Sequence, residues 1–413
     1  MFIIYQLLLS VIFIFSPIII FFRILKNKED KIRFKEKFCF FSKKRGDGKL
    51  IWFHGSSVGE IMSILPIINE YEKKKSINKI LITSSTLSSS KILERFKFKK
   101  VIHQFYPIDH VFFSNKFLNY WKPSVAIFLE SEIWPGMFIV LKKKKIPLVL
   151  LNARITKKTY ERWQIIRKFS YSIFNLISHA YPQNNETKNY LKRLNVKNVN
   201  FIGNLKFSEN NKLTNKTINE GFILKFKKYK TFIAASTHNS EELFAAKTHL
   251  ILKKKYKNLI TIIIPRHVHR VNQIIDQFKE LNLNILTHSS NNKSLKNIDI
   301  YLVDTFGDSK NFYRIATTVF LGGSIINRGG QNPLEPARFG ARILHGPNIS
   351  NFKEVYKYLN ILKISQKIKK PSEIAEKIIF KKNMKKVLNI NYLGKIILKK
   401  TIKKLDKFIN NDF

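Results

Sequence analysis

The chain has 413 residues, of which 44% are hydrophobic, and its 75 Lys and Arg against 28 Asp and Glu give a formal net charge of +47. This length exceeds one ordinary hydrophobic core and predicts two domains, while the hydrophobic content excludes a wholly disordered chain. The single cysteine excludes a disulfide framework and a cysteine-based zinc site, and it indicates a reducing, cytosolic setting.

The positive charge alone would favour nucleic acid, anionic lipid or a phosphorylated ligand as the partner. Most of the excess is lysine, however, and it accompanies abundant Asn, Ile, Phe and Tyr, a mixture typical of an AT-rich genome. We therefore discount much of the charge as an indication of function. The sequence has no aromatic-basic RNA motif and no recognisable DNA-reading helix, so no nucleic-acid partner is expected.

Residues 2–22 (FIIYQLLLSVIFIFSPIIIFF) carry no charge over about the length that spans a bilayer. They lack the basic start and the small-residue cleavage site of a secretory signal peptide. A strongly basic stretch follows from Arg23 to Lys37, and such flanks stay cytosolic, which places the rest of the chain on that side. We predict a membrane-anchor helix over residues 1–23. The alternative is a buried or interfacial helix, and Pro17 favours a break.

After this helix, short apolar runs alternate with longer amphipathic ones. Nearly continuous apolar character indicates strands buried on both faces of a parallel sheet, and the helical patterns between them are those of βαβ units. The strands predicted in a first group are 49–55, 79–86, 124–130 and 147–154, and those in a second group are 231–237, 259–267, 300–305, 317–323 and 341–347.

The two groups of strands are separated by a polar stretch, which predicts a linker over residues 209–229. The expected fold is therefore α/β, with two doubly wound Rossmann-like domains facing a cleft. The first domain is predicted over residues 24–208 and the second over residues 230–413. Ligands of such sheets bind outside the carboxyl ends of the strands, where polar clusters interrupt the apolar pattern.

Two polar clusters follow strands of the first domain. HGSSVGE (54–60) is a Gly/Ser-rich turn that opens a helix, and such a turn offers backbone N–H groups to a polar or anionic ligand. Glu60 would lie in the first helical turn, where a carboxylate either serves function or simply complements the helix dipole. ESEIWPG (130–136) places Glu130 and Glu132 at a strand end. Only one of these two carboxylates is expected to enter the cleft.

In the second domain, Arg266 follows an apolar run and could bind phosphate oxygens with its planar guanidinium. Zinc binding by His267 and His269 is disfavoured, because their spacing is poor for a helix and no third ligand is visible. Residues 320–347 combine a glycine turn with a predicted helix start at Asn332, where Pro333 would be the first helical residue. The helix N-terminus would face a phosphate, while Glu335 could accept hydrogen bonds from ribose hydroxyls.

These clusters also carry a resemblance that covers nearly the whole length. The segments FHGSSVGE, ESEIWPG, NARI, GNLKF, ASTHNSEE, PRHVHR, DTFGD, FLGGSIINRGGQNPLEPA and HGPNISNF follow one another in the order found in the 3-deoxy-D-manno-octulosonic acid (Kdo) transferases, which the chain resembles. It departs from the family pattern at Gly55-Ser56, usually two alanines, at Gln331, usually histidine, and at Asp308, usually glutamate. These loop positions concern substrate detail rather than the reaction.

The resemblance implies a GT-B fold and an inverting transfer of Kdo from the donor CMP-Kdo to the lipid A precursor, lipid IVA, in lipopolysaccharide biosynthesis. It implies no metal or other cofactor, and a location on the cytosolic face of the bacterial inner membrane, in contact with its lipid. The first domain would bind the acceptor and the second the CMP-sugar. Another membrane-associated GT-B lipid glycosyltransferase, using a UDP-sugar, is the alternative.

The family pattern also implies roles for particular residues. Glu60 corresponds to the general base, Glu130 and Lys206 would stabilise the transition state, and Glu132 is the substitute for Glu130. The residues implied in binding the CMP part of the donor are Pro265, Arg266, Phe306, Gly307, Asp308, Gly323, Ser324, Asn332, Pro333, Leu334 and Glu335.

Overall fold

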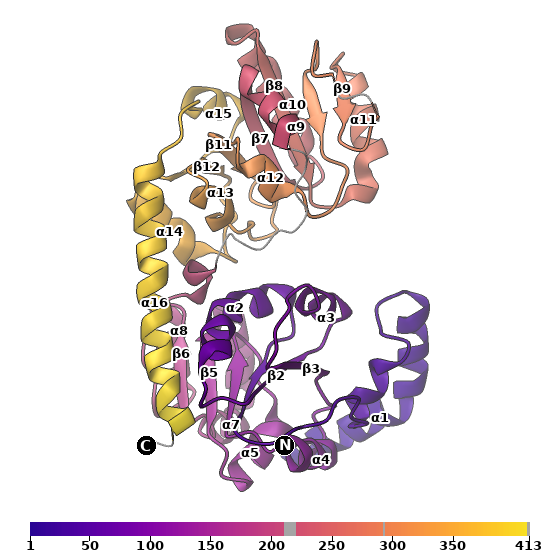
Figure 1. Cartoon of the computed structure of the whole chain (residues 1–413), viewed down its shortest axis with the longest axis vertical. Coiled ribbons are helices and arrows are strands. Elements are labelled where there is room, and N and C mark those ends of the chain that lie inside the picture. Colours follow the sequence, from indigo (N-terminus) through magenta and orange to yellow (C-terminus); the bar gives the residue numbers. More distant parts are fainter. Residues whose placement is uncertain (210–219, 292–293, 411–413) are drawn as a thin grey trace. The chain divides into compact units, whose positions relative to one another are not determined.

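The structure, a computed structural model, describes residues 1–209, 220–291 and 294–410. The chain divides into two compact units, one formed by Met1–Glu209 with Leu393–Phe413 and the other by Asn210–Tyr392. Each unit is built on one parallel β-sheet with helices packed against it (Figure 1). The prediction of two doubly wound α/β domains is therefore confirmed.

The first unit contains a six-stranded sheet in the order β3-β2-β1-β4-β5-β6, in which all neighbours are parallel. The chain builds the sheet outward from β1 on one side and then returns to build outward from β4 on the other. The strand order therefore reverses between β1 and β4, the position where open α/β sheets bind ligands. The strands are β1 (Leu50–His54), β2 (Lys79–Ser84), β3 (Val101–Phe105), β4 (Val125–Leu129), β5 (Leu148–Ala153) and β6 (His179–Pro182).

Helices cover both faces of this sheet, because successive strand residues point to opposite sides. Trp52 of β1 contacts Phe117 of α4, with ring centroids 4.9 Å apart. Its neighbour Phe53 contacts Tyr71 of α2 on the other face, at 6.5 Å. Figure 1 shows α2 and α4 on opposite sides of the strands. The helical segments of the unit are α1 (Phe2–Leu25), η1 (Arg33–Phe38), α2 (Val58–Lys73), α3 (Leu87–Leu93), α4 (Val111–Trp121), α5 (Pro135–Lys143), α6 (Lys157–Ile165), α7 (Arg167–Phe174), α8 (Asn185–Arg193) and η2 (Leu205–Ser208).

The second unit contains a seven-stranded parallel sheet in the order β13-β12-β11-β7-β8-β10-β9, and here the order reverses between β7 and β11. Its strands are β7 (Lys230–Thr237), β8 (Leu259–Pro265), β9 (Ile285–Thr287), β10 (Ile300–Leu302), β11 (Thr318–Leu321), β12 (Arg342–His345) and β13 (Ser365–Lys367). Its helical segments are α9 (Glu220–Lys225), η3 (Phe226–Lys228), α10 (Glu241–Lys255), η4 (Val268–Arg270), α11 (Val271–Lys279), α12 (Ser309–Tyr313), α13 (Leu334–Arg338), α14 (Lys353–Ile361) and α15 (Pro371–Lys377).

The last helix, α16 (Met384–Asn410), contains residues of both units, so the second domain does not extend to residue 413 as predicted. Its later part packs on the first unit, where Lys74 Nζ lies 2.6 Å from Asp406 Oδ2. Gly394 permits the close approach, since a Cβ there would lie 2.1 Å from the carbonyl oxygen of Phe207. A sequence pattern can indicate that a helix forms, but it does not show against which of the two units the helix packs.

The predicted linker, residues 209–229, is only partly a connection. Residues 210–219 lie outside the described residues, while residues 220–228 form α9 and η3. Phe226 is 1% exposed and contacts Tyr301 in the second unit, with ring centroids 5.1 Å apart. The end of the predicted linker therefore belongs to the core of the second unit.

Helix α1 is the uncharged N-terminal run predicted as an anchor. Among the described residues it is the one helix long and apolar enough to cross a membrane, with a mean hydropathy of 2.6 and 11% of its most apolar window buried. The expectation that Pro17 breaks the helix is wrong, because α1 is continuous through it. Pro17 has no N–H for the carbonyl of Phe13, and the hydroxyl of Ser16 donates to that carbonyl at 2.6 Å instead.

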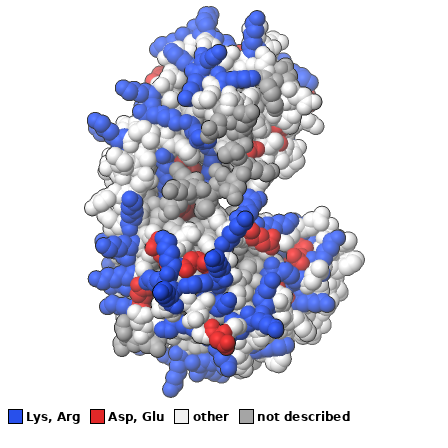
Figure 2. Space-filling model, in the orientation of Figure 1, with Lys and Arg blue, Asp and Glu red and all other residues white. Residues whose placement is uncertain are grey.

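On the face drawn in Figure 2, the Lys and Arg side chains do not form one compact patch. Figure 2 shows them spread over much of the visible face of both units, with Asp and Glu side chains among them. This distribution agrees with our interpretation that a large part of the net charge reflects composition rather than a single polyanion-binding surface.

Candidate active site

Three carboxylates lie beyond the carboxyl ends of β1 and β4, where the strand order of the first unit reverses. Glu60 is in the first turn of α2, and Glu130 and Glu132 follow β4. Ser56 contacts two of them, because its N–H donates to Glu60 Oε2 at 2.8 Å and its hydroxyl donates to Glu132 Oε2 at 2.7 Å. The charges of both Glu132 and Glu130 act on Glu60. The structure therefore brings together the carboxylates singled out in the sequence.

Glu60 is held by the turn that precedes α2. The hydroxyl of Ser57 accepts a hydrogen bond from the backbone N–H of Glu60 at 3.3 Å and donates one to its Oε1 at 2.9 Å. The N–H of Ser56 donates to Oε2 at 2.8 Å. Gly55 leaves room for this turn, because a Cβ there would lie 2.8 Å from Cδ1 of Leu129 and 3.1 Å from Cβ of Glu60. Ser57 thus caps α2, and Glu60 lies in the first turn, where its carboxylate can complement the helix dipole and also belongs to the acidic site.

The protonation of Glu60 differs from that of a free glutamate. A free glutamate has a pKa of about 4.3 and would be fully ionised at neutral pH. Burial, followed by the charges of Glu132 and Glu130, raises the pKa of Glu60 to about 7, although hydrogen bonds from Ser57 and Ser56 oppose the rise. Such a carboxyl exchanges its proton near neutral pH, where a general acid or base is most effective.

The pKa of Glu132 is shifted in the opposite direction. Its Oε2 accepts hydrogen bonds from Ser56 Oγ at 2.7 Å and Trp134 Nε1 at 2.8 Å, and lies 3.1 Å from Nε2 of the buried His54. Burial alone would raise the pKa of Glu132, but these hydrogen bonds and the interaction with His54 hold it below its ordinary value. Environments that push the pKa values of two neighbouring carboxyls apart mark an acid–base site.

Glu130 is buried and forms an ion pair with Lys206, whose Nζ lies 2.9 Å from Glu130 Oε1. Lys206 is in η2, and its backbone N–H donates to Oδ1 of Asn204 at 3.0 Å. The expectation that only one of Glu130 and Glu132 faces the site is wrong. Residues two apart on an extended chain point to the same side, so their spacing does not separate the two carboxylates, and Glu130 also lies at a turn, with a φ of +48°.

Three further side chains of this site were given no role from the sequence. His54, Ser56 and Trp134 all lie within the motifs HGSSVGE and ESEIWPG, and together they surround Glu132. The signal that could have identified them is their position, because each lies at or just after the carboxyl end of a buried strand.

In the second unit, the reversal of strand order between β7 and β11 is occupied by Glu241, which is fully buried. Its carboxylate accepts hydrogen bonds from the backbone N–H groups of Gly323 at 2.6 Å, Ser324 at 3.0 Å and Ile325 at 2.9 Å. Gly322 lets the turn wrap this carboxylate, since a Cβ there would lie 2.8 Å from Glu241 Oε2. Gly323 and Ser324 were predicted as donor-binding residues, but their N–H groups are engaged with Glu241, and Ser324 is buried.

Other predicted donor residues follow β8 and β10, which are adjacent in the sheet. Pro265 is the buried last residue of β8, and Arg266 directly after it is exposed. Phe306 is 79% exposed, and Gly307 has a φ of +99°. Asp308 Oδ2 accepts a hydrogen bond from Thr305 Oγ1 at 2.6 Å. These loops place an arginine and an exposed aromatic ring beyond the carboxyl edge of one sheet.

The helix start predicted at residues 332–335 forms one residue later than expected. Helix α13 begins at Leu334, not at Pro333, and its first N–H donates to Oδ1 of Asn332 at 3.1 Å. Glu335 is half-buried, and its charge adds to burial in raising the pKa of Tyr313. The prediction that Asn332 is the cap and Pro333 the first helical residue is therefore wrong by one position, since Pro333 is the residue before the helix, and Glu335 lies in the first turn.

Among residues 1–209, 220–291 and 294–410, no group of three or more His, Cys, Asp or Glu side chains is arranged to hold a metal ion.

The sequence is similar to that of proteins of one family. The sequence profile described as 3-deoxy-D-manno-octulosonic-acid transferase (kdotransferase) matches residues 32–209. The 3-deoxy-D-manno-octulosonic acid transferase of Rickettsia bellii is 35% identical over 361 residues, which are 86% of this chain and 85% of that protein. The enzyme of the same name from Haemophilus influenzae is 29% identical, over 75% of this chain and 73% of that protein.

Among solved structures, the UDP-GlcNAc 2-epimerase of Neisseria meningitidis, bound to UDP-GlcNAc, matches with a TM-score of 0.53 and 15% identity. The match covers 86% of this chain and all of that one. At this identity the likeness shows the fold alone, which is of the GT-B type with two parallel-sheet α/β domains.

Proposed function

The chain belongs to the Kdo transferase family, a family of glycosyltransferases in lipopolysaccharide biosynthesis, and we propose that it moves Kdo from CMP-Kdo to lipid IVA. The donor and the acceptor are the proposed parts of this statement. The observation that carries the proposal is the pair of carboxyls at the strand reversal of the first unit, with the pKa of Glu60 raised to about 7 and that of Glu132 lowered.

In the proposed reaction, the carboxylate of Glu60 takes the proton of an acceptor hydroxyl. The oxygen of that hydroxyl forms a bond to the anomeric carbon of Kdo, while the bond from that carbon to the phosphate oxygen of CMP breaks. CMP leaves with the electron pair of the broken bond, and attack on the opposite face inverts the anomeric centre. The pKa of Glu60 suits this step, because a base with a pKa near the working pH is both ionised and basic enough to be effective.

The neighbours of Glu60 have supporting roles in this proposal. Glu132 remains ionised and keeps the proton affinity of Glu60 high. Lys206, held by Glu130 at 2.9 Å, brings a positive charge to the same unit, where it would offset negative charge on the Kdo carboxylate or the departing phosphate. Glu130 fixes the position of that lysine, which is how it would contribute to the transition state.

We propose that the donor binds the second unit. The guanidinium of Arg266 would contact phosphate oxygens, and the loop of Phe306, Gly307 and Asp308 would contact the nucleotide. The first turn of α13 would face the ribose, with Glu335 accepting hydrogen bonds from its hydroxyls. In this arrangement Gly323 and Ser324 contribute to donor binding only as part of the loop whose shape is fixed by Glu241. The remaining proposed donor residues are Pro265, Asn332, Pro333 and Leu334.

The proposed location is the cytosolic face of the bacterial inner membrane, with α1 as the single anchor. A lipid acceptor requires access to a membrane, and the apolar α1 supplies a means of attachment. The basic stretch after α1 supports a cytosolic position for both units.

The substitution Glu60→Gln tests the proposed chemistry, because glutamine keeps the shape and hydrogen-bonding capacity but cannot accept the proton. Turnover with CMP-Kdo and lipid IVA should fall by about 10²–10⁴-fold, the usual contribution of positioned proton transfer, while CMP binding stays unchanged. Glu70→Gln, an exposed carboxylate on the same helix, is the matched control and should keep full turnover. Full turnover in Glu60→Gln would remove Glu60 as the base, and loss of CMP binding would make it a donor-binding residue.

A further inference from the structure

Helix α1 is bound to the first unit near its N-terminal end. The hydroxyl of Tyr5 donates to Asp109 Oδ2 at 2.7 Å, and the N–H of Val111 donates to Gln6 Oε1 at 2.9 Å. Asp109 is itself 2% exposed and accepts hydrogen bonds from the backbone N–H groups of Gly136 at 2.8 Å and Met137 at 2.7 Å. The start of α1 is therefore tied to a buried carboxylate of the folded unit.

The middle of α1 packs against the same unit. The ring of Phe13 lies 5.2 Å from that of Phe113 in α4 and 5.8 Å from that of Phe38 in η1, measured between centroids. Ser16 and Ile20 on the following turns are buried. Tyr5, Phe13, Ser16 and Ile20 thus define one face of the helix that contacts the unit along its length.

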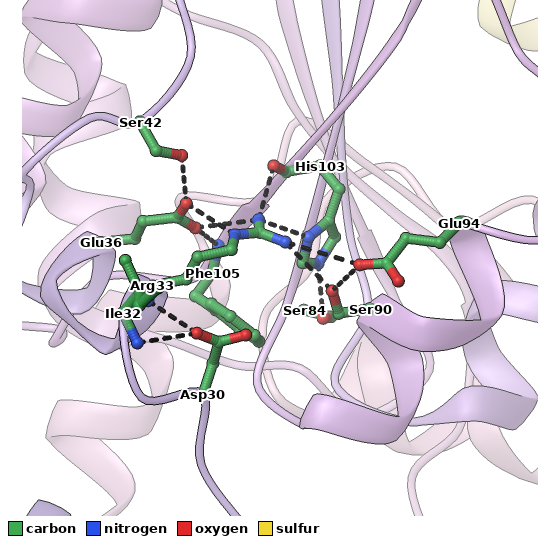
Figure 3. A network of polar contacts seen from close by, with 10 residues as sticks. All are labelled: Asp30, Ile32, Arg33, Glu36, Ser42, Ser84, Ser90, Glu94, His103 and Phe105. Atoms are coloured by element: carbon green, nitrogen blue, oxygen red, sulfur yellow. Dashed lines mark hydrogen bonds and ion pairs between the residues drawn. The ribbon is translucent and has the colours of Figure 1, made fainter.

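The C-terminal end of α1 is held as well. Arg23 Nε lies 3.0 Å from Glu29 Oε2, and Lys37 Nζ lies 2.6 Å from the same oxygen. The segment after α1 is fixed by the network in Figure 3, in which Arg33 bonds to Glu36 at 2.9 Å and to the carbonyl of His103 in β3, also at 2.9 Å. Both ends of α1 are therefore attached to one folded unit.

These contacts are incompatible with a helix that crosses the bilayer. At 1.5 Å per residue, the axis between Tyr5 and Arg23 is about 27 Å long, close to the ~30 Å thickness of a hydrocarbon core. A spanning helix would place Tyr5 on the far side of the membrane from Asp109. It would also leave Asp109 without the hydroxyl of Tyr5.

The outer face of α1 is apolar and exposed. Ile3, Ile14 and Leu25, spaced by eleven residues and hence about three turns apart, are 74%, 69% and 62% exposed. The apolar surface continues beyond the helix, because Phe112 of α4 and Phe40 are 62% and 60% exposed.

A basic rim accompanies this surface. Lys116 shares a helix face with Phe112, four residues earlier, and its Nζ lies 5.0 Å from the centroid of the Phe40 ring. Lys26, Lys28, Lys31 and Lys35 after α1 are exposed too. An apolar face bordered by lysines fits an anionic lipid surface, where each basic residue near the headgroups adds attraction.

We propose that α1 is an interfacial helix that lies along the surface of the cytosol-facing leaflet, with its outer face among the acyl chains and both ends on the side of the catalytic unit. This inference rests on the membrane location proposed above and refines it, but it does not depend on the transfer reaction. Because α1 is fixed to the first unit, a helix that lies in the membrane surface would also hold this unit at a fixed height above the leaflet.

That height matters for the acidic site. Asp109, which binds Tyr5, also binds the first N–H groups of α5, and α5 begins directly after Trp134, the residue that donates to Glu132. The docked helix therefore adjoins the segment that shapes the site. A lipid-borne acceptor hydroxyl lies at the headgroup level of the same leaflet, where this arrangement would present the carboxylates.

Depth-dependent fluorescence quenching tests the proposal. Single cysteines would be introduced as Ile3→Cys, Ile14→Cys and Leu25→Cys in the full chain carrying Cys39→Ser, which keeps a donor for the carbonyl of Phe113 that Cys39 Sγ contacts at 3.3 Å. The labelled proteins would be bound to phosphatidylethanolamine–phosphatidylglycerol vesicles that contain lipids brominated at different acyl positions. An interfacial α1 predicts the same shallow depth for all three labels. A label at residue 14 about 15 Å deeper than the other two would show a spanning helix and overturn the proposal.

Absence of quenching at all three positions would equally overturn it, since the outer face would then be covered by protein rather than lipid. A second measurement keeps the docking itself falsifiable. Tyr5→Phe removes one hydroxyl and should lower the unfolding temperature of the membrane-bound protein by about 2–4 °C, whereas Tyr392→Phe, an exposed tyrosine in α16, should not. An unchanged unfolding temperature in Tyr5→Phe would show that α1 is not held by Asp109. Neither measurement uses CMP-Kdo or lipid IVA, so a failed transfer assay leaves both interpretable.

Discussion

The substitution Glu132→Gln should shift the ionisation of Glu60 to lower pH. Burial raises the pKa of Glu60 first, and the charge of Glu132 is the larger of the two neighbouring carboxylate contributions. Glutamine removes that charge while keeping an oxygen that can accept from Ser56 and Trp134, whose donors lie 2.7 Å and 2.8 Å from Glu132 Oε2. The pKa of Glu60 should then fall from about 7 toward the ordinary glutamate value.

The size of the effect follows from the fraction of Glu60 that is ionised. With a pKa of about 7, roughly a tenth of Glu60 is ionised at pH 6, and a midpoint near 6 in the variant would raise this to about half. Because the base acts in its ionised form, kcat/KM at pH 6, relative to its own plateau at high pH, should rise about fivefold in Glu132→Gln.

Two measurements can detect this shift in the pKa of Glu60. The pH dependence of kcat/KM gives the midpoint for an active variant, and carbon-detected NMR titration of the Glu60 carboxyl gives it for an inactive one. Ser56→Ala, which removes a hydrogen bond to Glu132 but keeps its charge, is the matched control and should move the midpoint less. A midpoint in Glu132→Gln that stays at the wild-type value, or rises, would refute the reasoning that the two carboxylates interact.

Two further predictions concern stability and donor binding. Lys206→Met leaves Glu130 buried without its cation, so the free energy of unfolding, measured by chemical denaturation, should fall by about 3–5 kcal/mol. Adding Glu130→Gln should recover part of this loss. A double variant no more stable than Lys206→Met would contradict this prediction. Glu335→Gln should weaken CMP binding by about 1–3 kcal/mol in titration calorimetry with an unchanged unfolding temperature, and wild-type affinity would remove Glu335 from the donor site.

The strands show what the sequence could and could not predict. All nine strands predicted from apolar runs are present, from β1 (Leu50–His54) to β12 (Arg342–His345). The four strands that were missed, β3, β6, β9 and β13, are the edge strands of the two sheets. An edge strand has one neighbour and needs less apolar character, as in Ser365–Lys367 of β13, whose three residues range from buried to exposed. The apolar pattern identifies only strands that are buried on both sides.

The acidic site was predictable in its members but not in its arrangement. Glu60, Glu130 and Glu132 follow buried strands, and the carboxyl ends of parallel strands meet at one edge of a sheet. The turn at Glu130, with a φ of +48°, was not expected from a segment that continues a strand. The raised pKa of Glu60 likewise depends on burial and on neighbours from another strand, which no local pattern contains.

The same limit explains Glu241 in the second unit. Glu241 was given no role from the sequence, and Gly323 and Ser324 of the glycine turn after β11 were expected in the donor site. These two segments are about 80 residues apart in the chain, and the fold places the carboxylate inside the turn, with Gly323 N at 2.6 Å from Glu241 Oε2. Each local interpretation was reasonable alone, but the contact between the two segments changes what the turn can bind.

The most direct test of the central claim is the mass of the reaction product. Purified full-length protein would be incubated with CMP-Kdo and lipid IVA, and the lipid would be analysed by mass spectrometry alongside a reaction containing Glu60→Gln. The proposed function predicts that lipid IVA gains the mass of one or more Kdo residues with the wild-type protein, that CMP is released in equal number, and that the variant forms far less product in the same time. An unmodified lipid IVA with folded wild-type protein, or a product formed equally well by Glu60→Gln, would contradict the account.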